Sequence, residues 1–94
     1  MKQVRVIVQF ISAEVGGRKN KPPIGVFSAV TTFDDQPRTV RGAWQMAFHF
    51  DRVGLLHTGL ASWVSDQAPE EALVPGALFS VLEDSHTVAR GMII

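Results

Sequence analysis

The chain has 94 residues, of which 46% are hydrophobic and 19% are charged, and nine basic side chains balance nine acidic ones. This length suits one domain spanning 1–94, and the zero net charge argues against the strongly basic surface of a typical nucleic-acid-binding domain. The chain has no cysteine, which excludes disulfides, thiolate catalysis and cysteine-ligated zinc.

Targeting and membrane signals are also absent from the sequence. The first apolar stretch, 4–11, is interrupted by Arg5 and Gln9 and lacks a small-residue cleavage site, unlike a secretory signal. No apolar run approaches the roughly 20 residues that a bilayer-spanning helix needs. We therefore expect a cytoplasmic protein that makes no membrane contact.

Apolar and polar residues alternate with a period of two along most of the chain, which predicts β-strands. In the first strand Val4, Val6, Val8 and Phe10 share one face. Clusters of turn-forming residues separate the apolar runs. The expected strands are 3–14, 24–33, 39–50, 57–65, 77–83 and 87–94.

The clearest alternation runs from residue 40 to residue 51. Trp44, Met46 and Phe48 project to one side, whereas Gln45 and His49 project to the other. A strand with a single apolar face is typical of antiparallel sheets. Over the whole chain we expect these side chains to be mostly buried: Val6, Val8, Phe10, Trp44, Met46, Phe48, Phe79, Val81 and Val88.

One segment, 65–73, has a helical pattern, with a capping residue, a proline near the first helical position and acidic residues in the first turn. It is followed by Pro75 and Gly76, so we expect one or two turns that form a lid over a barrel end. The remaining chain predicts an all-β fold, a six-stranded, mainly antiparallel β-barrel. Closure of the barrel would leave no exposed strand edges to aggregate.

The two ends of the chain carry the most distinctive motifs. The C-terminal hairpin has Phe79, Val81 and Glu83 before a short turn, then Thr87-Val88 and Gly91-Met92-Ile93. The N-terminal strand, Val4–Ala13, runs into Glu-Val-Gly-Gly-Arg at 14–18 and then reaches Pro22. Both patterns resemble the C-terminal β-barrel domain of translation elongation factor Tu, and they cover about 40 of the 94 residues.

The resemblance implies a stand-alone barrel without the GTPase domain of that family, and therefore no guanine-nucleotide site. The family's last barrel contacts the T-stem of aminoacyl-tRNA and the nucleotide exchange factor. Its RNA-facing Arg-Pro-Gln-aromatic motif is replaced here by residues 25–29, Gly-Val-Phe-Ser-Ala. Asp84, in the turn before the last strand, would repel phosphate. The resemblance thus implies the fold more strongly than it implies RNA binding.

Three groups of residues are candidates for contact with a partner. Arg18, Lys19 and Lys21 form a basic turn, which lacks the Gly-Lys-Ser/Thr ending of a nucleotide-binding loop. Glu70 and Glu71 begin the predicted lid. Trp63 would be the best single anchor for a protein partner if its side chain is exposed, because tryptophan is enriched in binding hot spots.

No residue pattern indicates catalysis or a bound metal. His49, His57 and His86 are too far apart in the sequence to form a close ligand motif. Asp84, Ser85 and His86 are adjacent in a turn, which does not give the geometry of a catalytic triad. We therefore predict no enzymatic activity, no cofactor and no metal.

Two functions are compatible with these features. The first is a non-catalytic module that binds a protein partner, and the alternative is a translation-associated module that binds tRNA or other RNA weakly. The zero net charge favours the protein-binding function, because interfaces with nucleic acids are strongly positive.

Overall fold

The computed structural model describes residues 2–11, 25–33, 43–84 and 86–94. This part of the chain contains six strands and a single turn of 3-10 helix, η3. The elements are β1 Val4–Phe10, β2 Gly25–Phe33, β3 Ala43–Arg52, β4 His57–Trp63, η3 Glu70–Ala72, β5 Leu78–Glu83 and β6 His86–Ile93.

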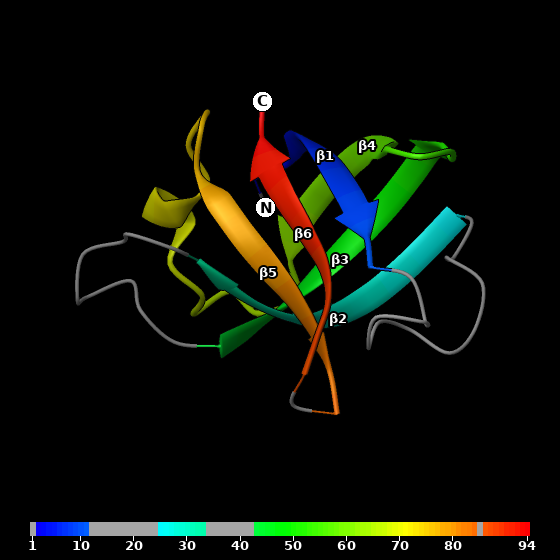
Figure 1. The fold of residues 1–94 in the computed structure, drawn as a ribbon. Coiled ribbons are helices and arrows are strands. Elements are labelled where there is room, and N and C mark those ends of the chain that lie inside the picture. The colour runs from blue at the N-terminus through cyan, green and yellow to red at the C-terminus, as the bar shows by residue number, and fades with distance from the viewer. Residues whose placement is uncertain (1, 12–24, 34–42, 85) are drawn as a thin grey trace.

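The strands form a closed barrel in the order β1-β4-β3-β2-β5-β6, as Figure 1 shows. Strands β2, β3 and β4 follow one another as a meander, and β5 and β6 form a hairpin. Strand β1 closes the ring because it pairs with β4 on one side and β6 on the other. All six pairings are antiparallel, which confirms the predicted all-β barrel.

The strand limits differ slightly from the expected ones. The third strand extends to Arg52, beyond the expected end at residue 50, and the fourth ends at Trp63. The parts of the expected strands at 12–14, 24 and 39–42 lie outside the described residues. The last hairpin turns at Asp84, whose φ of 49° is a conformation that aspartate tolerates better than most residues.

The β3–β4 pair contains an irregularity that helps the barrel to curve. The register shifts between Phe50 and Arg52, opposite Gly59. A Cβ atom at residue 59 would collide with the carbonyl oxygen of His49 and lie 2.7 Å from Cα of Phe50. Glycine at this position therefore allows the two backbones to approach closely, as bulges and bends in sheets require.

The interior is occupied by apolar side chains from every strand. Seven of the nine predicted core residues are buried: Val6, Val8, Met46, Phe48, Phe79, Val81 and Val88. Phe10 and Trp44 are only half-buried and pack against the edge of this cluster. At its centre the ring of Phe48 stacks on Phe50 and Phe79, with centroid distances of 5.5 and 6.0 Å.

The segment between β4 and β5 covers one end of the barrel. Its helical part is a single 3-10 turn that begins after Pro69 and has no side-chain cap, so the predicted capping residue does not cap it. Ala68, Ala72 and Leu73 are buried in the same cluster as the strands. The expected lid is therefore present, held by apolar contacts rather than by helix capping.

The position of Phe48 leads to a stability prediction. Phe48→Ala should lower the free energy of unfolding by about 3–5 kcal/mol, because the substitution removes a buried ring and leaves a cavity. Urea denaturation followed by circular dichroism measures this loss. Val26→Ala on β2 is the matched control, since Val26 is 65% exposed and should change stability little. An unchanged midpoint for Phe48→Ala would contradict the inward orientation of the residue.

Candidate functional site

The structure places the three predicted groups of contact residues very differently. Arg18, Lys19 and Lys21 lie outside the described residues. Glu70 and Glu71 are exposed on η3, so both carboxylates are available to a partner. These two positions stay candidates, although no contact in the described part of the chain assigns them a role.

Trp63 was a candidate anchor only if its side chain is exposed, and the side chain is buried. Only 2% of the residue is exposed, and its indole Nε1 donates a hydrogen bond to the carbonyl oxygen of Pro69 at 2.9 Å. The ring also packs edge-on against Phe33. Trp63 is therefore a structural residue that fastens the lid to the barrel, and we withdraw it as a surface anchor.

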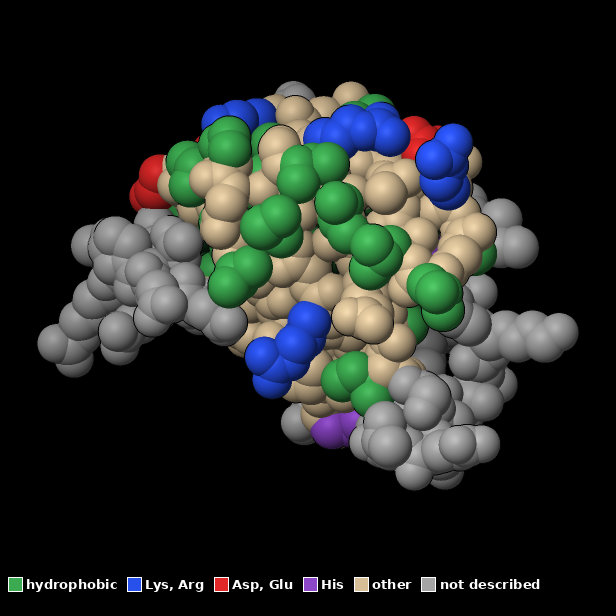
Figure 2. Space-filling view, turned by 45° about the horizontal axis from the view of Figure 1, so that its top comes forward, with side chains coloured by type: hydrophobic (Ala, Val, Ile, Leu, Met, Phe, Trp, Pro, Cys, Tyr) green, Lys and Arg blue, Asp and Glu red, His purple; other side chains and the backbone are tan. Residues whose placement is uncertain are grey.

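A different surface stands out on the outside of the barrel. Alternation along the strands that bury Val6, Val8 and Ile93 turns their neighbours outward, and several of these neighbours are apolar. Met92 on β6 pairs with Ile7 on β1 and with Leu78 on β5, so these side chains form one row across three strands. Figure 2 shows hydrophobic side chains gathered on one face of the molecule.

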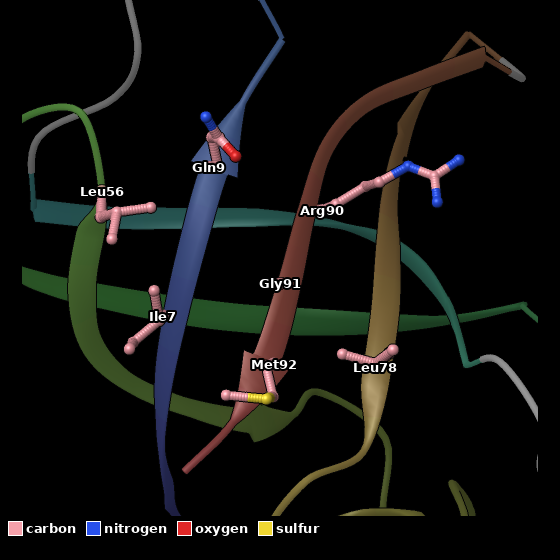
Figure 3. A pocket seen from close by; sticks show the side chains of 7 residues that line it. All are labelled: Ile7, Gln9, Leu56, Leu78, Arg90, Gly91 and Met92. Atoms are coloured by element: carbon pink, nitrogen blue, oxygen red, sulfur yellow. The ribbon is translucent and has the colours of Figure 1, made fainter.

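This row lies in an open, shallow groove of about 230 Å³. We call it the outer groove, and its lining residues are Ile7, Gln9, Leu56, Leu78, Arg90, Gly91 and Met92. In Figure 3 the side chains of Leu56 and Ile7 lie between β4 and β1, and Met92 and Leu78 continue the apolar surface across β6 and β5. Leu56 and Leu78 are each 49% exposed, so the groove presents apolar area to solvent.

Charge is distributed unevenly around the outer groove. Arg5, on β1, donates to both carboxylate oxygens of Asp51 at 3.2 and 2.9 Å, and Thr58 donates to Oδ1 of the same carboxylate at 3.3 Å. The hydrogen bond from Arg5 holds the pKa of Asp51 below its ordinary value. Arg5 is thus neutralised by its neighbour.

Arg90 has no such partner among the described residues, and it is the only charged residue of that set in the groove lining. Its side chain extends from β6 across β5 in Figure 3. The hydrocarbon stem can therefore contribute to the apolar wall while the guanidinium lies at the border, as is usual for arginine. The outer groove is apolar with one cation at its edge.

Sequence reasoning missed this groove because its residues come from four separate strands or strand ends. A weak signal was present: Ile7, Leu78 and Met92 interrupt the polar face of an otherwise alternating pattern. Each one taken singly is ordinary, since isolated exposed apolar residues are common. Only the strand order brings them together.

His57 is a buried polar residue with an unusual environment. It is 1% exposed, and neither ring nitrogen has a hydrogen-bond partner in the described structure. Phe10 and Phe50 flank the imidazole, with centroid distances of 5.0 and 5.2 Å. Burial lowers the pKa of His57 below its ordinary value of 6.5, because the charged form loses solvation.

The other candidate chemical groups are not assembled by the fold. His49 is exposed on the outside of β3 and His86 is exposed at the start of β6, whereas His57 points into the core. Among the described residues no three histidine or carboxylate side chains cluster as metal ligands would. The absence of a metal and of catalysis stays a prediction.

Comparisons with known protein families, with characterised proteins and with solved structures each return no match to the chain. The resemblance to the last barrel of elongation factor Tu therefore rests on the residues at the two ends of the chain alone. The helix in the described part of the chain, a single 3-10 turn, is too short to cross a membrane.

The environment of His57 predicts how stability changes with pH. The unfolded chain takes up a proton near pH 6.5, whereas the folded chain does so only at lower pH. The stability that neutral His57 contributes is complete above pH 6.5 and falls as the pH decreases below it. Denaturation midpoints measured between about pH 5 and 7 should show this fall.

His57→Leu should flatten that part of the pH profile, because leucine fits the apolar site and does not titrate. The matched control is His86→Gln, which removes an exposed histidine and should keep the fall at low pH because His57 is still present. Identical pH profiles for the unmodified protein and His57→Leu would show that His57 is not the responsible group.

Proposed function

We propose that this protein is a non-catalytic binding module, and that it binds a protein partner through the outer groove of a stand-alone, elongation-factor-Tu-like barrel. The observation that carries the proposal is the row of outward apolar side chains formed by exposed Leu78 and half-buried Ile7 and Met92, with exposed Leu56 beside it. Contiguous apolar surface rimmed by polar residues is a mark of interaction sites.

The shape of the groove favours a protein over a small molecule. Pockets for small ligands are concave and cover most of the ligand surface. The outer groove is open rather than enclosed, so a small molecule bound there would keep much of its surface in water. A protein surface or segment can cover the groove and exclude water from Leu56 and Leu78.

Barrel closure restricts how such a partner can bind. Addition of a strand from another chain requires an exposed sheet edge, and each described strand already pairs with two neighbours. Although the described pairing of β2 with β5 covers only residues 30–33 of β2, we expect the partner to contact mainly outward side chains. The lid segment that carries Glu70 and Glu71 is hydrogen-bonded to β6, with Gly76 N–H donating to Ile93 O, and neither glutamate lines the groove.

Site-specific photo-crosslinking in cells that produce the protein tests the proposed surface. A photoreactive amino acid at Leu56 or Leu78 should form a defined protein adduct, whereas the same group at Ser28 should not. Ser28 is the matched control because it is exposed on the outside of β2 and does not line the groove. Equal labelling from Ser28 and Leu56 would contradict a docking role for the outer groove.

The alternative function, RNA binding, leads to a separate prediction. Purified protein titrated with tRNA or with GTP at about 150 mM salt should not bind either ligand with a sub-micromolar dissociation constant. A cluster of two or three cations releases few counterions, so any affinity for RNA should be weak and should fall further with salt. Tight tRNA binding under these conditions would support a translation-associated role instead.

A further inference from the structure

We infer that the outer groove recognises a protein segment with apolar side chains and an adjacent carboxylate, the carboxylate pairing with Arg90. This inference rests on the proposed function and adds the chemistry of the partner. The apolar part follows from Ile7, Leu56, Leu78 and Met92, which form the floor and walls of the groove. The acidic part follows from the charges around it.

Two arginines on this side of the barrel differ in whether they form an ion pair, and this difference favours a partner with negative charge. The positive charge of Arg5 is balanced by the carboxylate of Asp51, so Arg5 attracts an incoming partner only weakly. Arg90 makes no ion pair in the described part of the chain and lines the groove itself. A carboxylate at this position could accept two hydrogen bonds from the guanidinium, the strongest common arrangement for an ion pair.

A second cation reinforces this preference. In the strand register Thr58 pairs with Ile7 on one side and with Arg52 on the other, so Arg52 continues the row that contains Ile7. Arg52 is exposed. Figure 2 shows side chains of both signs at the border of the apolar face, Lys or Arg as well as Asp or Glu. An uncompensated cation at a border attracts partners of opposite charge.

Two other occupants fit the groove less well. In a dimer formed by groove-to-groove contact, the Arg90 residues of both copies would enter one interface whose described lining contains no acid. Like charges in an interface are unfavourable. A small carboxylate-bearing amphiphile would pair with Arg90, but the open groove would leave its apolar part in water.

Selection from a random peptide library displayed on phage tests the inference directly. Against the unmodified protein, enriched peptides should combine apolar residues with Asp or Glu. Against Arg90→Glu, the enriched peptides should keep the apolar residues and exchange the acid for Lys or Arg. Synthetic copies of the acidic peptides should bind Arg90→Glu about tenfold more weakly or worse, and Arg90→Lys should lose less, because it keeps the charge but not the fork geometry.

Leu78→Asp and Leu56→Asp serve as groove variants, since both leucines are half-exposed and the substitutions should leave the fold intact. Thermal unfolding confirms that each variant folds. Both should abolish peptide binding, while Ser28→Asp on the other side of the barrel should not.

The possible results separate the inference from the function on which it rests. Peptides whose binding is lost with Leu78→Asp but unchanged with Arg90→Glu would contradict the inference of an acidic partner. They would still support binding in the outer groove. Peptides insensitive to both leucine variants, or no enrichment at all, would overturn the inference, and crosslinking from Leu56 then decides the proposed function independently. A dimer in sedimentation experiments that Leu78→Asp dissociates would replace the acidic segment with a second copy.

Discussion

Closure of the sheet by β1 is the constraint on which the rest of the structure depends. Val6 pairs with Gly59 of β4 and with Ile93 of β6, so one strand near the start of the chain joins a central strand to the last one. The closed ring gives every described strand a neighbouring strand on both sides. It also gives each strand one inner and one outer face, which assigns every alternate side chain to the core or to the surface.

The inner face is filled by aromatic and branched side chains, and the open end is covered by the lid. Phe48 lies between Phe50 and Phe79, and Trp63 ties the lid to the barrel through Pro69. His57 is enclosed by the same closure, with its ring nitrogens unpaired in the described structure. The apolar site favours the neutral form of His57, and the stability of the barrel therefore decreases when the pH falls.

The outer face is where a closed barrel can meet a partner. Every described strand has a neighbouring strand on both sides, so the proposed recognition uses outward side chains. The outer groove is the place where apolar side chains from β1, β5 and β6 meet. Arg5 and Arg90 look alike in the sequence, but in the fold Arg5 pairs with Asp51 whereas Arg90 has no ion pair among the described residues. The proposed chemistry of the partner thus rests on the neighbours of each charged side chain rather than on the net charge of the chain.

The sequence by itself determined the number and approximate limits of the strands, because a period of two is a local property of each strand. It also identified the inner faces of β1 and β3, where Val6, Val8, Met46 and Phe48 make the alternation strongly apolar. The side of Trp63 could not be read in the same way. The inward positions of β4 are His57, Gly59 and Ala61, whereas Leu60 faces outward, so its pattern has little contrast.

The tertiary structure alone decided which strands are neighbours, and with them the outer groove. Ile7, Leu56, Leu78 and Met92 are distant in the sequence, and their meeting depends on β1 lying between β4 and β6. Alternation orients a side chain relative to its own strand but contains no information about the next strand. That information comes from hydrogen bonds between residues far apart in the chain, and it exists only once the barrel has closed.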